Sequence, residues 1–127
     1  MTNRILRDIL QYGLTHLNTH PEFRHYIHFS FIVVDNQIVT VGKNRAVEPP
    51  PYYGYHKRVE KPKIHSELDA YSKYKWKTVG FEMVNLRLSR QGEMKLSKPC
   101  PICAEWLSQT MCTGLVYSTK EGWEWIR

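Results

Sequence analysis

Two short segments of the sequence, HSE and PCPIC, contain side chains that can bind a metal ion. Cys100 and Cys103 are three residues apart, so a helix that begins here would place both on one face. The dipole at the start of a helix favours the thiolate, the form of cysteine that binds metals. With His65 as third ligand, zinc would keep one coordination position open for water, as catalytic zinc sites do. We expect Glu67 to reach that water and carry its proton without binding the metal.

These two segments resemble the motif of the cytidine deaminase superfamily, in which His-x-Glu is followed by Pro-Cys-x-x-Cys. The resemblance covers roughly residues 28 to 119. It implies an α/β protein, a three-layer α/β/α sandwich with a mixed central sheet. In the segment VGKN it implies that Asn44 contacts the substrate sugar. Ser66 stands where the family usually has alanine, and its backbone amide is implied to contact the substrate.

The resemblance also implies a reaction, the hydrolysis of a cytosine base to uracil. Zinc lowers the pKa of a bound water from about 15.7 to about 7, which makes hydroxide available at neutral pH. Glu67 would take the proton of this water, pass it to the ring nitrogen, and help to protonate the departing ammonia. Pro99, with its fixed φ, is expected in the first turn of the helix, where it would orient the two thiolates.

Plainer interpretations of the same residues stay open. A Cys-x-x-Cys pair could serve redox chemistry, and a zinc that only supports the fold would need a fourth ligand. Cys112 is the candidate for that ligand, but on a continuous helix it would lie half a turn away from Cys103. Asn44 could be a turn residue. The carboxylate of Glu67 argues against a purely structural zinc, which has no use for it.

The substrate is expected to be a free nucleoside or nucleotide, of the cytidine or dCMP type. Only eight residues follow the strand LVYST, so the last strand should be antiparallel, as in enzymes that act on free nucleosides. The alternative is a deaminase of bases in single-stranded DNA or RNA, including adenosine in tRNA. Its support is the basic and aromatic segment RAVEPPPYYGYHKRVEKPK, in which Lys57 or Arg58 could bind a phosphate. The base and the sugar are left undecided.

The periodicity of the chain predicts the elements that hold these residues. Apolar residues at helical spacing predict a helix over 2–18, and β-branched runs predict a hairpin in HFSFIVVD and QIVTVG. The proline-rich residues 44–63 should be a loop. Further elements are expected as a helix over 64–76, a strand in VNLRLSR, a short extended piece through Leu96, a helix over 100–111 ended by Gly114, and strands in LVYST and GWEWIR.

Composition limits the class of protein. A chain of 127 residues is expected to form a single domain, 1–127, and no apolar run approaches the roughly 18 residues that a membrane span needs. Charges interrupt the apolar residues at the start, which argues against a signal peptide. Three cysteines cannot form a complete disulfide framework, so we expect a cytoplasmic protein without membrane contact. The formal charge of +6 favours an anionic partner, and we expect a homo-oligomer.

Overall fold

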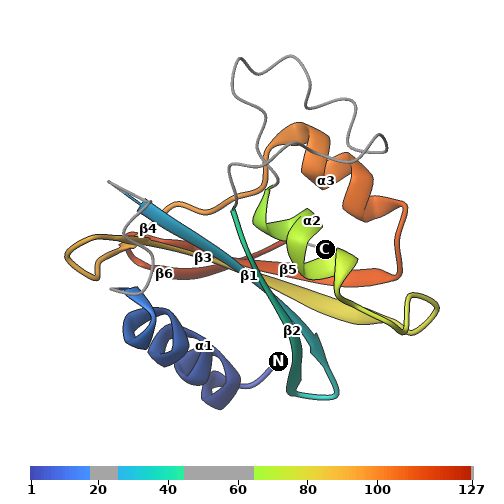
Figure 1. Ribbon diagram of the computed structural model, residues 1–127, viewed down its shortest axis with the longest axis horizontal. Helices are drawn as coiled ribbons and strands as arrows, with labels where there is room; N and C mark the ends of the chain where they lie inside the picture. The colour runs from blue at the N-terminus through green and yellow to red at the C-terminus, as the bar shows by residue number, and fades with distance from the viewer. Residues whose placement is uncertain (18–25, 45–64, 127) are drawn as a thin grey trace.

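The computed structural model describes residues 1–17, 26–44 and 65–126. Within these ranges the chain forms one mixed sheet and three helices (Figure 1). The elements in chain order are α1 (Asn3–Thr15), β1 (Tyr26–Val34), β2 (Gln37–Lys43), α2 (Ser66–Ser72), β3 (Phe81–Ser89), β4 (Met94–Lys95), α3 (Pro101–Ser108), β5 (Cys112–Thr119) and β6 (Gly122–Ile126).

The strands lie in the order β2-β1-β3-β5-β6, and the short β4 pairs with β3. The predicted hairpin joins β1 to β2 through Asp35 and Asn36, which both adopt positive φ, 50° and 59°. Strands β3 and β5 are parallel, because α3 crosses over between them, and β6 returns antiparallel to β5. The predictions of a mixed sheet and of an antiparallel last strand are therefore confirmed.

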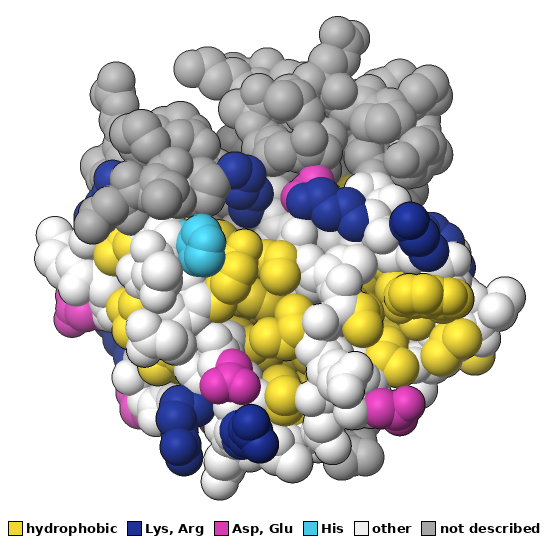
Figure 2. All heavy atoms as spheres, turned by 60° about the horizontal axis from the view of Figure 1, so that its bottom comes forward, with side chains coloured by type: hydrophobic (Ala, Val, Ile, Leu, Met, Phe, Trp, Pro, Cys, Tyr) yellow, Lys and Arg dark blue, Asp and Glu magenta, His cyan; other side chains and the backbone are white. Residues whose placement is uncertain are grey.

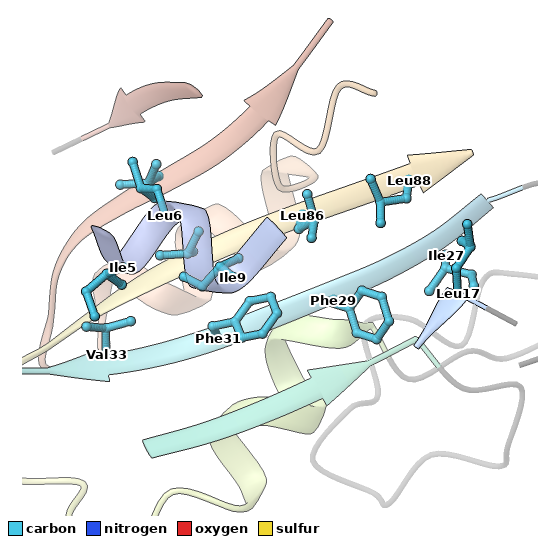
Figure 3. Close-up of a cluster of buried hydrophobic side chains, with 12 residues drawn as sticks. Ile5, Leu6, Ile9, Leu17, Ile27, Phe29, Phe31, Val33, Leu86 and Leu88 are labelled. Carbon is cyan, nitrogen blue, oxygen red and sulfur yellow. The ribbon is translucent and has the colours of Figure 1, made fainter. Parts of the chain in front are cut away.

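The helices cover both faces of the sheet, so the expected three-layer arrangement is confirmed. Figure 1 shows α1 on one face and α2 and α3 together on the other. The α1 face holds a cluster of aliphatic and aromatic side chains, in which Ile9 of α1 meets Phe31 of β1 and Leu86 of β3 (Figure 3). The opposite face holds a second cluster of buried apolar side chains. It comprises Ile32, Ala70, Tyr74, Phe81, Met83, Leu107 and Leu115.

Helix α1 forms because its apolar residues recur on one side. Ile5, Leu6 and Ile9 are buried, and Thr2 caps the start by accepting a hydrogen bond from the backbone N–H of Ile5 at 3.4 Å. The helix ends at Thr15, earlier than predicted, because the backbone of His16 turns out of helical geometry. This layer fixes the sheet from the face opposite α2 and α3.

The other two helices are shorter than predicted. Helix α2 ends at Ser72 instead of residue 76, and the side-chain ammonium of Lys77 binds the carbonyl groups of Tyr71 and Tyr74 just beyond that end. Helix α3 ends at Ser108 instead of residue 111.

The residues after α3 also differ from the prediction. The hydroxyl of Thr110 bonds the Leu107 carbonyl at 2.7 Å, and Cys112 already begins β5. Gly114, predicted to end the helix, lies within that strand. Strand β3 likewise begins earlier than predicted, at Phe81.

The surface seen from the side of α1 carries apolar side chains among polar and charged ones (Figure 2). Among the described residues, Trp76, Leu96 and Trp125 are more than half exposed, at 59%, 55% and 52%. Exposed residues of this size suit a contact between copies, and the homo-oligomer stays a prediction. No helix in the described ranges has the length and apolar character to cross a membrane.

Candidate functional site

The starts of α2 and α3 lie on the same face of the sheet and present the residues singled out by the sequence (Figure 1). His65 is the N-cap of α2 and Cys100 the N-cap of α3, and both have extended backbones, with ψ of 152° and 160°. Pro101 occupies the first position of α3, where a missing N–H costs nothing. The role expected of Pro99 is therefore wrong in position, because Pro99 precedes the cap.

The three candidate ligands converge. The Nδ1 atom of His65 lies 3.3 Å from Sγ of Cys103 and 3.8 Å from Sγ of Cys100, and the three ligand atoms are all within 4.8 Å of one another. Zinc bonds of about 2.3 Å to sulfur and 2.1 Å to nitrogen, at tetrahedral angles, would separate N and S by roughly 3.6 Å. The donor types and their spacing fit a zinc ion with three protein ligands.

The charge around Cys103 also calls for a cation. Burial raises the pKa of the Cys103 thiol, and the neighbouring Glu67 and Cys100 raise it further. Desolvation and the neighbouring negative groups therefore oppose the thiolate that the start of α3 is expected to favour. Two thiolates beside a carboxylate become favourable only when a cation sits among them, which is the situation that a zinc ion creates.

Glu67 is held inside the protein beside this cluster. Its side chain is 6% exposed on the first turn of α2. Oε2 accepts a hydrogen bond from Nδ2 of Asn85 at 3.0 Å, and Oε1 lies 3.3 Å from the hydroxyl of Ser66. A buried carboxylate with fixed donors has a defined direction, which a proton carrier needs.

A cavity of about 240 Å³ opens over these residues. It contains polar groups from four separate segments of the chain. Its walls are formed by His28, Asn44, His65, Ser66, Glu67, Ser97, Lys98, Pro99 and Cys100. The cavity joins two of the three candidate ligands, His65 and Cys100, with Glu67 and Asn44, as expected if they serve one substrate.

Asn44 is tied to the first residues of β1. Its backbone N–H donates to the carbonyl of His28 at 3.4 Å, and its Oδ1 accepts from the backbone N–H of His28 at 3.2 Å. These bonds fix the oxygen and leave the Nδ2 protons as the hydrogen-bonding groups that the side chain can offer to the cavity. Contact with a substrate sugar stays a prediction.

Two other expectations have different outcomes. Lys57 and Arg58 lie outside the described residues. Cys112 lies outside the group formed by His65, Cys100 and Cys103, and its Sγ donates to the carbonyl of Gly114 at 3.3 Å. Cys112 was predicted to point away from Cys103 on a continuous helix. That premise is wrong, because Cys112 belongs to β5 and not to a helix.

A group of buried polar residues that the sequence did not predict lies behind Glu67. Ser30 of β1 and Asn85 of β3 are paired across the two strands and are 0% and 3% exposed. Ser97 joins them, because its carbonyl accepts from Nδ2 of Asn85 at 3.2 Å. A serine and an asparagine inside otherwise apolar strands were the available signal, since polar side chains enter a core only with partners.

The fold has counterparts among solved structures. The dCMP deaminase of cyanophage S-TIM5 in its apo form has a TM-score of 0.57 at 15% identity, covering 92% of this chain and 84% of that one. Its complex with dCMP and dUMP gives 0.58 at 16%, covering 92% and 82%. A cytidine deaminase from Mycobacterium leprae gives 0.57 at 18%, covering 98% and 94%.

These similarities establish the fold, which is the cytidine deaminase-like fold expected from the sequence. No protein-family model matches the chain, and no curated protein matches its sequence.

Proposed function

We propose that this chain is a zinc-dependent hydrolase that deaminates a cytosine base in a free nucleoside or nucleotide. The observation that carries the proposal is the convergence of His65, Cys100 and Cys103 beside a cavity that His65, Cys100 and Glu67 line. The first three would hold the zinc ion, and the fourth would move protons. The deaminase-like fold supports this assignment.

Zinc would supply a Lewis acid that makes a water molecule acidic at neutral pH. Glu67 would accept the proton of the water and deliver it to the ring nitrogen of the base. It would then carry a proton to the amino group that leaves as ammonia. Asn44 would hold the sugar, and the backbone amide of Ser66 would contact the base.

A free nucleoside or nucleotide is favoured as substrate because β6 runs antiparallel to β5, the arrangement that the resemblance links to enzymes of free nucleosides. The dCMP deaminase of similar fold was solved with dCMP and dUMP. Lys98, an exposed side chain on the cavity wall, could meet a phosphate, as could Lys57 or Arg58. Deamination of bases in single-stranded DNA or RNA is the second candidate, on account of the basic and aromatic segment around Lys57.

The test is ammonia release from a panel of cytidine, deoxycytidine, CMP, dCMP, adenosine and single-stranded oligonucleotides. We expect the zinc-loaded protein to act on a cytosine monomer, and Glu67→Gln to lose at least about 100-fold in kcat while it retains zinc. Activity on oligonucleotides alone would favour the second candidate. A Glu67→Gln variant with full activity would contradict the assigned role.

A further inference from the structure

We propose that Asn85 is a positioning residue for the Glu67 carboxylate, and that Ser30 and Ser66 complete a hydrogen-bond chain that serves Glu67 both with and without its proton. This inference rests on the proposed function. Its structural basis is a group of four side chains, Ser30, Ser66, Glu67 and Asn85, that are at most 6% exposed. Water cannot replace a lost partner easily at such depth.

The orientation of the Asn85 amide follows from its neighbours. Its two contacts on one side are the Oε2 atom of Glu67 at 3.0 Å and the carbonyl oxygen of Ser97 at 3.2 Å. Both atoms accept hydrogen bonds, so the NH₂ group must face them and both of its protons are used. The oxygen Oδ1 of Asn85 then faces the hydroxyl of Ser30, at 2.7 Å.

This orientation sets the direction of the next bond. A carbonyl oxygen has no proton, so Ser30 must donate its single proton to Asn85. The hydroxyl of Ser66 lies 2.7 Å from that of Ser30, and with the Ser30 proton committed, Ser66 must be the donor. The Ser66 oxygen also lies 3.3 Å from Oε1 of Glu67. One proton on Ser66 therefore has two possible acceptors.

The two acceptors match the two forms that Glu67 takes in the proposed reaction. When Glu67 is a carboxylate, the Ser66 hydroxyl can turn to Oε1. When Glu67 carries the transferred proton on Oε1, it can donate to Ser66, which donates to Ser30 and through it to Asn85. Rotation of one hydroxyl is enough, and Asn85 holds Oε2 in place throughout. The family resemblance gives alanine at position 66, which could not do this.

A test that needs no turnover is the side-chain amide resonance of Asn85 in ¹⁵N-labelled, zinc-loaded protein. We expect both protons to exchange slowly with water, because both are bound. In Glu67→Ala one proton should exchange at least about 10-fold faster, while the proton bound to Ser97 stays protected. Ser89→Ala is the matched control, since Ser89 is a buried hydroxyl of the same strand that binds the N–H of Glu93 instead.

A kinetic test separates positioning from a general structural role. Asn85→Leu removes a hydrogen bond to a charged group, and we expect kcat to fall about 10- to 100-fold with KM and zinc content unchanged. Ser30→Ala should lower kcat about 2- to 10-fold. In the Asn85→Leu background its effect should be smaller, because the contact of Ser30 with Asn85 is already lost and only its contact with Ser66 remains. Asn85→Asp keeps the size of the side chain and an oxygen that can accept from the Ser30 hydroxyl, but it removes the NH₂ group that binds Glu67. It replaces Asn85→Leu in this test if Asn85→Leu does not fold.

The outcomes are distinguishable. Identical Asn85 resonances in the parent protein and Glu67→Ala, or an Asn85 variant with unchanged kcat, would overturn the positioning role. Independent, additive effects of Ser30→Ala and Asn85→Leu on kcat would overturn the proposed hydrogen-bond chain from Ser66 through Ser30 to Asn85. A parent protein that releases no ammonia from any substrate would instead refute the proposed function. The Asn85 amide resonances would still show whether Asn85 binds the Glu67 carboxylate.

Discussion

Gly42 of strand β2 lies directly against the backbone of helix α2, so Gly42→Ala is a sharp test of how the fold positions the site. A Cβ atom at this position would lie 2.2 Å from the backbone nitrogen of Ala70 and 2.4 Å from the carbonyl oxygen of Ser66. Both are backbone atoms of α2, so no side-chain rotation can relieve the clash. The helix would have to move away from the sheet.

The size of the effect follows from the geometry. Ordinary contact begins at 3.4 Å, so α2 must shift by roughly 1 Å, and overpacking of this kind lowers the free energy of unfolding by about 1–3 kcal/mol. The shift would strain the bonds from Thr40 to the Ala70 carbonyl and from the Lys43 N–H to Asp69, both 3.0 Å. It would also carry His65 and Glu67 away from the cysteines. A 1 Å displacement of reacting groups can lower a rate by about 100-fold.

The assay combines urea unfolding with zinc content and kcat. The matched control is Gly114→Ala on β5, where the nearest atom to an added Cβ is the Ile126 carbonyl oxygen at 3.9 Å. We expect the control to keep stability, metal and activity, and Gly42→Ala to lose all three in part. If Gly42→Ala matches the control in unfolding midpoint and zinc affinity, the contact between Gly42 and the backbone of α2 does not position that helix, and the prediction is refuted.

Three further predictions concern individual side chains. The double variant Cys100→Ser, Cys103→Ser should purify without zinc, measured by metal analysis, and equal zinc in parent and variant would exclude this site. Lys98→Ala should raise KM for a nucleotide about 10-fold or less and leave a nucleoside unchanged, and equal changes for both would remove the phosphate contact. Burial raises the pKa of Cys112 above its ordinary 9.0, so at pH 8 the thiol stays protonated. Mass spectrometry should find slower alkylation of Cys112 in the folded than in the unfolded protein, and equal rates would contradict this.

The sheet could be predicted because its signals are local. The hairpin between β1 and β2 combines two β-branched runs with an Asp-Asn turn, and Glu121-Gly122 after LVYST suits a tight turn into an antiparallel strand. The ends of the helices could not be predicted from the sequence, because tertiary contacts determine where each helix stops. Lys77 binds the carbonyl groups of Tyr71 in the last turn of α2 and of Tyr74 just after it, and the last predicted turn of α3 is replaced by the start of β5. Apolar patterns alone do not distinguish these choices.

The candidate ligands could be predicted because the spacing Cys-x-x-Cys and the His-x-Glu segment are typical of zinc deaminases. The residues behind Glu67 could not. In the sequence, Asn85 is simply a polar residue within a predicted strand, and its partner Ser30 lies 55 residues earlier in the chain. Only the pairing of β1 with β3 brings them together. Burial and the nearby Glu67, which raise the pKa of Cys103, are likewise properties of the folded site and not of the sequence motif.

The polar pair across β1 and β3 also bears on how the chain finds its fold. In the observed register Ser30 faces Asn85, while their neighbours Phe31 and Val84 face the α1 layer. A slip of β1 by one residue would turn Ser30 into that apolar layer and leave Asn85 without its partner. Each buried group stranded in this way costs about 1–3 kcal/mol. The pair therefore penalises misaligned strands during folding. A sequence redesigned with apolar residues at both positions would lose that penalty, and with it the selection of a single register.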